Sequence, residues 1–244
     1  MKAALSPEQV AKYESDGYLV VQDLMSESEI DNFIEDANQP KTPEWKALGL
    51  RKHTADSHWN SIAAHPRTSA IVRQLMNGNP RIVQTMYMAK SQKGDTGVAL
   101  HQDTHYIRNE PNTLMACWVA MSDTDKNNGG LCVVPGSHGR PLYETQLPSD
   151  DTQHASWEQV YEMSDPEGQK WDEPMHSHEV QGLDSEEIVY LTVPKGGGVF
   201  FTGMTIHGSF ANATSDRPRL AFATHYVKED TWVYRADIQD TVPV

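Results

Sequence analysis

The spacing of apolar residues changes near residue 80, and the change predicts two kinds of secondary structure. Before that point apolar side chains recur every three or four residues, as in amphipathic helices. The elements predicted there are helices from Ser6 to Gly17, Ser26 to Pro40 and Thr68 to Asn77, and a short strand at 18–21. Ser6 and Ser26 are each followed three residues later by Gln or Glu, which is the capping-box pattern of a helix start.

Residues 41–66 follow neither the helical nor the strand period. His53, His58 and Trp59 of this segment could line a pocket, but the polar surroundings favour a solvated loop.

From Arg81 onward the pattern becomes that of short β-strands separated by turn residues. The predicted strands lie at 81–90, 98–101, 113–121, 131–134, 188–193, 199–202 and 219–227. In the first of them, alternation places Ile82, Gln84, Met86 and Met88 on one face. Helices followed by many strands favour a mainly β fold with flanking helices, a β-sandwich or jelly roll.

Residues 142–187 interrupt this β pattern with a strongly acidic segment. It carries 13 Asp or Glu and one Lys, and so holds −12 of the chain's net charge of −14. Long irregular segments in compact domains are usually functional or disordered. We expect one domain over residues 1–244, with 142–187 as a lid-like insertion that contains some helix.

Composition limits the partners of the protein. A net charge of −14 disfavours binding to nucleic acid or to anionic membranes. No apolar run is long enough for a transmembrane helix, and the first residues lack the apolar core of a signal peptide. Cys117 and Cys132 lie in apolar runs and are expected to be buried thiols. These features predict a cytoplasmic monomer or homodimer that acts on a small molecule.

The most informative motif is His101-Gln102-Asp103, which follows a predicted strand. On an extended chain, side chains two residues apart point to the same face, so an imidazole and a carboxylate could reach one metal ion. His207 is the candidate third ligand. Two His and one carboxylate are the ligand set of non-haem Fe(II) oxygenases. The motif by itself is also compatible with a surface pair.

Four segments occur in an order that makes the motif more specific. They are 5–21, His101–Asp103, the run 128–138 (Asn-Gly-Gly-Leu-Cys-Val-Val-Pro-Gly-Ser-His), and 207–219. Together they resemble the phytanoyl-CoA dioxygenase family of Fe(II)/2-oxoglutarate oxygenases over about residues 6–227. The resemblance implies a double-stranded β-helix, or jelly roll. It also implies Fe(II) as cofactor, 2-oxoglutarate and O2 as co-substrates, and His101, Asp103 and His207 as metal ligands and catalytic centre.

The same resemblance implies a set of residues that bind 2-oxoglutarate. The arginine that pairs with its distal carboxylate corresponds to Arg219, with Arg217 as the alternative because the preceding loop is one residue longer than usual. The remaining implied contacts, the last three by way of the relative ectoine hydroxylase, are Ser209, Gln84, Thr104 and Trp118. A guanidinium suits this role because it donates two parallel hydrogen bonds to a carboxylate. On the strand 219–227, Arg219 shares a face with Ala221, Ala223 and His225.

We therefore expect a dioxygenase that hydroxylates an unactivated C–H bond of a small polar metabolite and releases succinate and CO2. Desaturation or ring closure would use the same residues. Tyr106 and Arg108 are the candidate substrate contacts. The alternatives are a jelly-roll binding protein and a metal-dependent isomerase or hydrolase on the same scaffold. Because the insertion is so acidic, we expect no activity on the polyphosphate-bearing coenzyme A thioesters.

Overall fold

The computed structural model describes residues 4–37 and 49–244, and its centre is a pair of facing antiparallel sheets. The first sheet has six strands in the order β1-β12-β5-β14-β2-β16, and the second has four in the order β11-β6-β13-β3. The bounds of the first are Tyr18–Val21, Gly198–Thr202, Met115–Ala120, Arg219–Lys228, Pro80–Lys90 and Val242–Pro243. Those of the second are Val189–Tyr190, Leu131–Val133, His207–Ser209 and Val98–His101. The predicted mainly β, jelly-roll fold is confirmed.

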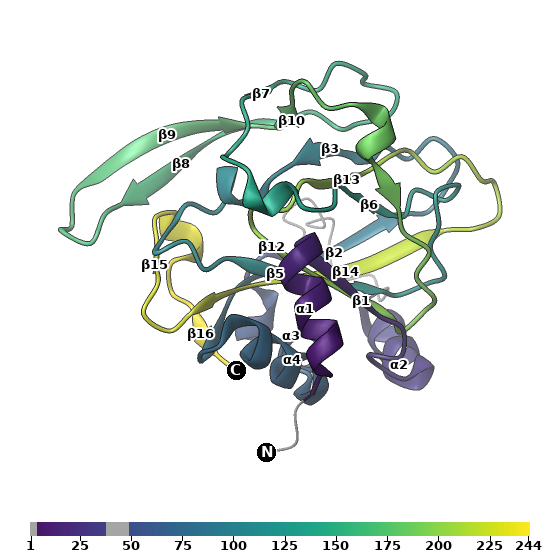
Figure 1. The fold of residues 1–244 in the computed structure, drawn as a ribbon, viewed down its shortest axis with the longest axis horizontal. Coiled ribbons are helices and arrows are strands. Elements are labelled where there is room, and N and C mark those ends of the chain that lie inside the picture. Colours follow the sequence, from purple (N-terminus) through teal and green to yellow (C-terminus); the bar gives the residue numbers. More distant parts are fainter. Residues whose placement is uncertain (1–3, 38–48) are drawn as a thin grey trace.

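Helices cover the outer face of the six-stranded sheet, as Figure 1 shows. They are α1 (Pro7–Asp16), α2 (Glu27–Ala37), α3 (Ser57–Ala63) and α4 (Pro66–Met76). Both predicted capping boxes form, at Ser6 and at Ser26. Gly17 ends α1 with a φ of +78°, a conformation that glycine adopts without a steric cost. The predicted end of α2 at Pro40 lies outside the described residues.

The expectation of a solvated loop before residue 66 is wrong for its described part. Asp56 caps α3 by accepting hydrogen bonds from the backbone N–H groups of His58 and Trp59. Trp59 is buried against Phe33, with their rings edge to face and 5.7 Å apart. A helix of seven residues spans only about two turns, and its sequence is largely polar. This short pattern is weak, which explains why the sequence alone did not predict the helix. Residues 41–48 lie outside the described part of the chain.

Apolar residues form two main layers of core on either side of the six-stranded sheet. The outer layer joins the helices to residues such as Phe222 and Tyr226 of β14. The inner layer lies between the sheets and contains Trp118, Ala221 and Ala223. The alternation predicted for β2 fails at its start, because a β-bulge shifts the register near Gln84 and turns Ile82 to the outer layer.

The acidic segment 142–187 is built from strands and not from helices, contrary to expectation. It contains β7 (Thr145–Gln146), β8 (Glu158–Ser164), β9 (Lys170–His176) and β10 (Glu179–Val180). A short 3-10 turn at 185–187 is its one helical feature. β8 and β9 form a hairpin that projects from the body in Figure 1. The segment is hydrogen-bonded to the barrel, for instance from the Ala155 N–H to the Gly97 carbonyl at 3.0 Å.

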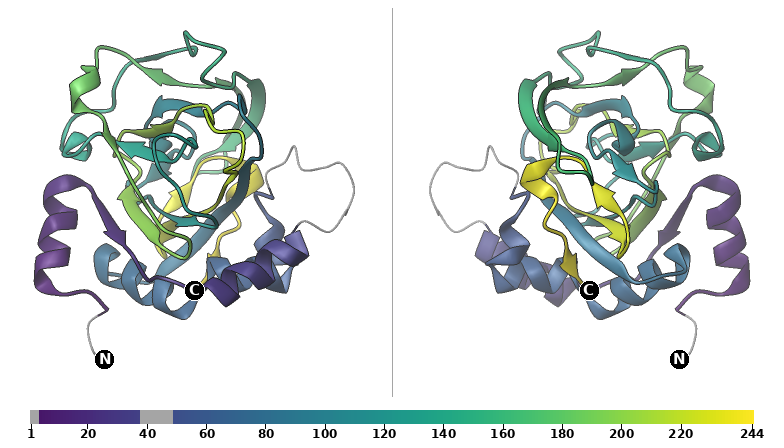
Figure 2. Two further views of the ribbon diagram at one scale, coloured as in Figure 1. Left: turned by 90° about the vertical axis from the view of Figure 1, so that its right-hand side faces the viewer. Right: turned by 90° about the vertical axis from the view of Figure 1, so that its left-hand side faces the viewer.

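The last residues form structure for which the apolar pattern gave no prediction. β15 (Trp232–Val233) pairs with β4 (Asn109–Glu110), and β16 adds to the edge of the six-stranded sheet beside β2. Figure 2 shows that the chain ends on the helical side of the molecule. Within the described residues, no helix is both long enough and apolar enough to span a membrane.

Candidate metal centre

The two histidines of the predicted metal site lie on neighbouring strands of the smaller sheet. His101 is the last residue of β3 and His207 is the first of β13, and the two are direct partners in the strand register. The two-residue alternation predicted Asp103 on the same strand, but the strand ends at His101. Asp103 begins a 3-10 turn, Asp103–His105, after an extended Gln102, and the turn returns its carboxylate to the two imidazoles.

All three side chains converge on one point through single ligand atoms. Asp103 Oδ1 lies 3.4 Å from His101 Nε2 and 3.6 Å from His207 Nε2. The other ring nitrogen of each histidine donates to a backbone carbonyl, His101 Nδ1 to Ala99 at 2.7 Å and His207 Nδ1 to Thr205 at 2.9 Å. These bonds fix the tautomer that leaves each Nε2 lone pair free for a metal ion.

The electrostatics of the cluster favour the protonation states that metal binding requires. Burial lowers the pKa of His207 to about 4, against the opposing effect of Asp103, so its imidazole is neutral near pH 7. Burial would raise the pKa of Asp103, but the neighbouring imidazoles of His207 and His225 and the hydrogen bond from His225 outweigh it. The pKa of this carboxyl is therefore held well below its usual range, and the group is ionised.

A second set of buried polar groups lies beyond His207 on the same strand. Ser209 Oγ, two residues after His207, accepts a hydrogen bond from Lys90 Nζ at 3.0 Å. Lys90 also donates to the Gly129 and Phe210 carbonyls, and Arg219 Nε donates to the Gly129 carbonyl at 3.2 Å. Lys90 and Arg219 are register partners on β2 and β14, so their cationic heads share one interior region.

Neither Lys90 nor Arg219 forms an ion pair with a carboxylate among residues 4–37 and 49–244. Arg219 Nη1 is buried without any hydrogen-bond partner. Burial, together with the charge of Arg219, lowers the pKa of Lys90 to about 6, and burial lowers that of Arg219 to about 10. A buried guanidinium without an ion-pair partner is costly, and an anion placed between Arg219 and Lys90 would relieve that cost.

The structure separates the two arginines that the sequence left as alternatives. Arg217 lies at the surface, where its Nη2 pairs with Asp125 Oδ2 at 2.6 Å. Arg219 is buried between the sheets. Lys90 is the residue of this region that sequence reasoning missed. Its position at the end of a strand resembles a solvent-exposed terminus, and only the pairing of β2 with β14 brings it beside Arg219.

The remaining predicted co-substrate contacts occupy different parts of the same interior. Trp118 is buried in the inner core layer, opposite Ala223 in the register. Thr104 Oγ1 is buried and has no hydrogen-bond partner. Gln84 Nε2 donates to His225 Nδ1 at 3.3 Å, and its Oε1 is buried without a partner. Unpartnered polar atoms inside a protein mark places where a ligand or water completes the hydrogen bonding.

The two candidate substrate contacts differ from each other. The Tyr106 ring lies 5.3 Å from that of His101, and its hydroxyl accepts a hydrogen bond from the His178 N–H in the insertion at 2.7 Å. Arg108 is exposed and stacks on the Tyr234 ring, 4.5 Å from its centroid. Tyr106 therefore joins the metal centre to the insertion, whereas Arg108 is engaged at the surface.

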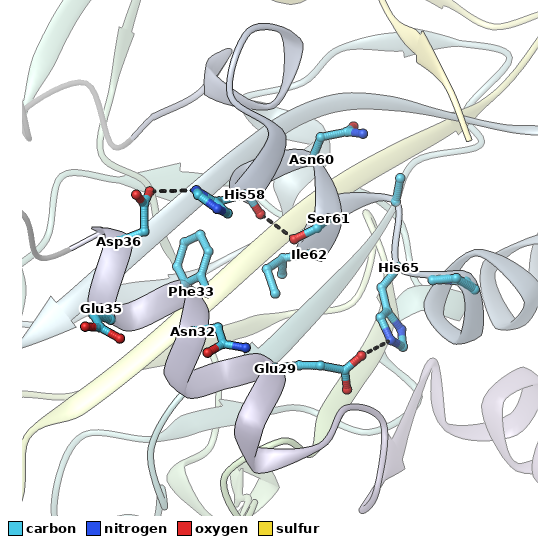
Figure 3. A pocket seen from close by; sticks show the side chains of 12 residues that line it. Glu29, Asn32, Phe33, Glu35, Asp36, His58, Asn60, Ser61, Ile62 and His65 are labelled. Atoms are coloured by element: carbon cyan, nitrogen blue, oxygen red, sulfur yellow. Dashed lines mark hydrogen bonds and ion pairs between the residues drawn. The ribbon is translucent and has the colours of Figure 1, made fainter.

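A pocket between α2 and α3 lies on the outer, helical side of the molecule (Figure 3). His58 Nδ1 lies 3.1 Å from Asp36 Oδ2 there, and His65 Nε2 lies 3.3 Å from Glu29 Oε1. Asp36, His58 and the neighbouring Asp56 form another group of closely spaced ligand atoms. These residues are partly or fully exposed, whereas His101, Asp103 and His207 are all buried.

The fold and the buried cluster together define a class of protein. Two imidazoles and one carboxylate inside a jelly roll are the arrangement of the non-haem iron oxygenases. Residues 13–221 match the family model described as phytanoyl-CoA dioxygenase (PhyH), and the chain belongs to this family.

Curated relatives agree with this assignment. The chain is 29% identical to the peroxisomal phytanoyl-CoA dioxygenase of Rattus norvegicus, over 93% of this chain and 69% of that protein. It is 24% identical to a phytanoyl-CoA dioxygenase of Arabidopsis thaliana, over 99% of this chain and 98% of the relative.

Solved structures of lower identity share the fold. The non-heme alpha-ketoglutarate-dependent carbocyclase SnoK from nogalamycin biosynthesis matches with a TM-score of 0.70 at 21% identity, over 98% of this chain and 91% of that one. EctD from S. alaskensis, solved with 2-oxoglutarate and 5-hydroxyectoine, matches with a TM-score of 0.65 at 20% identity, over 93% and 77% of the two chains.

Family membership makes Fe(II), 2-oxoglutarate and O2 the cofactor and co-substrates of this chain. The residues of the interior fit these groups. The Nε2 atoms of His101 and His207 and the ionised Asp103 are suitable metal ligands, and the unpartnered Arg219 Nη1 is a suitable donor to a carboxylate.

Proposed function

We propose that the protein hydroxylates an unactivated C–H bond of a small polar metabolite, with conversion of 2-oxoglutarate and O2 to succinate and CO2. The observation that carries the proposal is that the metal cluster shares one interior with Arg219 and Lys90, two buried basic side chains that form no ion pair among the described residues. A binding module has no need of an ionised metal-ligand set next to a carboxylate-binding pair.

His101, Asp103 and His207 would hold the metal through His101 Nε2, His207 Nε2 and Asp103 Oδ1. Three ligands on one face of an octahedron leave three positions open, enough for a bidentate 2-oxo acid and O2. When bound, the iron supplies the oxidation chemistry. The protein contributes orientation and the exclusion of water.

The distal carboxylate of 2-oxoglutarate would bind to Arg219, Lys90 and Ser209. Ser209 follows His207 by two residues on an extended strand, which places the two positions about 7 Å apart. That spacing suits a five-carbon dicarboxylate with one end at the metal and the other at the cations. Trp118 and Thr104 would line the space between them.

We further propose that the substrate is not a coenzyme A thioester, in spite of the family name. Binding several phosphate charges normally requires a cluster of free cations. The arginines near the motif and the insertion are engaged: Arg140 with Glu187, Arg108 on Tyr234, and Arg235 with Asp237. The insertion's one lysine pairs with Glu162. Aromatic side chains such as Trp157 and Tyr106 would suit a small molecule, including one with an amine or quaternary ammonium group.

The outcome of the reaction needs its own measurement, because two of the structural neighbours are named as an epimerase and a carbocyclase. Asp103 favours hydroxylation over halogenation, since the carboxylate occupies a position that a halide would need. Mass spectrometry of the product separates hydroxylation, a gain of one oxygen atom, from desaturation or ring closure, a loss of two hydrogen atoms.

Two assays test the proposal. Anaerobic titration of the protein with Fe(II) and 2-oxoglutarate should give the weak visible charge-transfer band of the chelate, which a binding module lacks. Succinate release should then be screened against a panel of amino acids, betaines and coenzyme A thioesters. Substrate-dependent succinate release excludes a hydrolase and an isomerase that does not consume 2-oxoglutarate. Turnover of a coenzyme A thioester would contradict the proposed substrate class while leaving the oxygenase assignment intact.

A further inference from the structure

The two oxygen atoms of Asp103 have different partners in the structure. Oδ1 faces His101 Nε2 and His207 Nε2, the point on which the metal ligands converge. Oδ2 lies 3.1 Å from His225 Nε2, on the inner face of β14. Asp103 and His225 are both buried, so water does not compete for either oxygen. The protein itself therefore holds the carboxylate in one orientation.

The hydrogen bonding also determines which tautomer of His225 is present. The Gln84 amide nitrogen can only donate a hydrogen bond, so His225 Nδ1 accepts with its lone pair and the ring proton lies on Nε2, which donates to Asp103 Oδ2. Gln84 Nε2 donates to that lone pair at 3.3 Å. The β-bulge in β2 makes this contact, because it brings Gln84 opposite His225 and onto the inner face.

We propose that His225, oriented by Gln84, is a positioning residue that restricts Asp103 to one-oxygen coordination of the metal. The inference rests on the proposed function, in which His101, Asp103 and His207 are the metal ligands. A carboxylate with both oxygens free can bind a metal through both. A second oxygen would occupy one of the three positions that 2-oxoglutarate and O2 require. By holding Oδ2, His225 keeps that position open.

The structure offers a matched control on the opposite face of the same strands. His53 is also buried, and its Nδ1 lies 3.3 Å from Oγ1 of Thr85, the residue after Gln84. Its contacts are on the helical side of the sheet, away from Asp103. A change at His53 therefore tests the general cost of altering a buried histidine near β2.

The test uses anaerobic Co(II) as a metal probe, followed by isothermal titration calorimetry and by visible absorption with and without 2-oxoglutarate. His225→Phe keeps a ring but removes the donor, and we expect metal affinity to fall by about 10–100-fold. The Co(II) band of the 2-oxoglutarate complex should also change in intensity, because the coordination number changes. His225→Gln keeps an N–H donor and should restore most of the affinity. His53→Phe should leave both measurements unchanged.

Wild-type affinity and an unchanged Co(II) band in His225→Phe would overturn the proposal. If circular dichroism shows that His225→Phe does not fold, Gln84→Leu is the deciding variant. A several-fold loss of Co(II) affinity supports the proposal that Gln84 orients His225, and no loss overturns it. A different result would contradict the proposed function itself. If His101, Asp103 and His207 were not the metal ligands, wild type and His101→Ala would bind Co(II) equally, whatever the behaviour of the His225 variants.

Discussion

Two regions of the molecule differ in their environment. One is the interior between the two sheets, and the other is the insertion over residues 142–187. The interior is buried, carries ionised and cationic groups, and holds each through hydrogen bonds from neighbouring strands. The insertion carries most of the net negative charge and exposes apolar side chains: Val160 in its hairpin is 60% exposed, and Trp157 just before the hairpin is 39% exposed. The two regions meet where Tyr106 accepts the hydrogen bond from His178.

The difference between the two regions corresponds to two parts of the proposed function. Groups that activate O2 must be arranged before the substrate arrives, and strands in a closed register supply that rigidity. A region that selects a substrate needs variable surface, which an insertion can change without disturbing the barrel. We therefore expect changes in the interior to affect co-substrate chemistry, and changes in the insertion to affect the prime substrate alone.

The largest effect should come from the metal ligands. His101→Ala or Asp103→Ala should abolish iron binding and succinate formation, because two ligands no longer hold the metal in a defined geometry. The fold should persist, since the core layers do not depend on these side chains. Calorimetry with Fe(II) under argon and circular dichroism measure both. Full turnover in either variant would refute the site assignment.

The next largest effect should distinguish Arg219 from Arg217. Arg219→Leu should raise the KM for 2-oxoglutarate by at least about 30-fold, since losing a buried charge-assisted pair costs about 2–5 kcal/mol. Arg217→Leu should change it little, because its ion pair with Asp125 is at the surface. Steady-state succinate assays give both values. The reverse ranking would mean that the distal carboxylate binds elsewhere.

A smaller, pH-dependent effect should arise from Lys90. Its pKa is lowered to about 6 in the free protein, so the amine is mostly neutral at pH 8 and about half charged at pH 6. A bound carboxylate raises that pKa, so binding takes up a proton and affinity falls as the pH rises, by up to about tenfold per unit. Calorimetry at saturating Co(II) between pH 6 and 8 measures this slope.

Lys90→Met should flatten that slope and weaken binding most at pH 6. Lys170→Met is the matched control, because Lys170 is an exposed lysine paired with Glu162 in the insertion. An equal slope in wild type and Lys90→Met would place the proton uptake at another group.

The smallest effects should come from the boundary with the insertion. They test most directly whether the interior and the insertion act independently. Tyr106→Phe removes the acceptor of the His178 N–H and should raise the KM of the prime substrate a few-fold, with 2-oxoglutarate affinity unchanged. Arg108→Ala should have less effect still, because this side chain is engaged at the surface. A change in 2-oxoglutarate affinity in Tyr106→Phe would show that the two regions are not independent.

Several features could be predicted from the sequence because they depend on neighbours in the chain. The capping boxes at Ser6 and Ser26, the period of β14 and the His-x-Asp motif each lie within a few residues. Local patterns failed where tertiary packing decided the outcome. Trp59 lies on a short helix that is stabilised by packing against Phe33, and the strands of 142–187 pair with each other in spite of a composition typical of solvated segments.

The class of fold, the likeness to a family, and the residue types that could bind a metal and a carboxylate can thus be predicted from local patterns. Which of these groups share an environment depends on tertiary packing. Lys90 meets Ser209 across 119 positions, and Gln84 meets His225 across 141, through strand pairings and a bulge that no local pattern encodes. Burial of these groups then alters their pKa values and fixes their tautomers, because both effects require that water is excluded around the group.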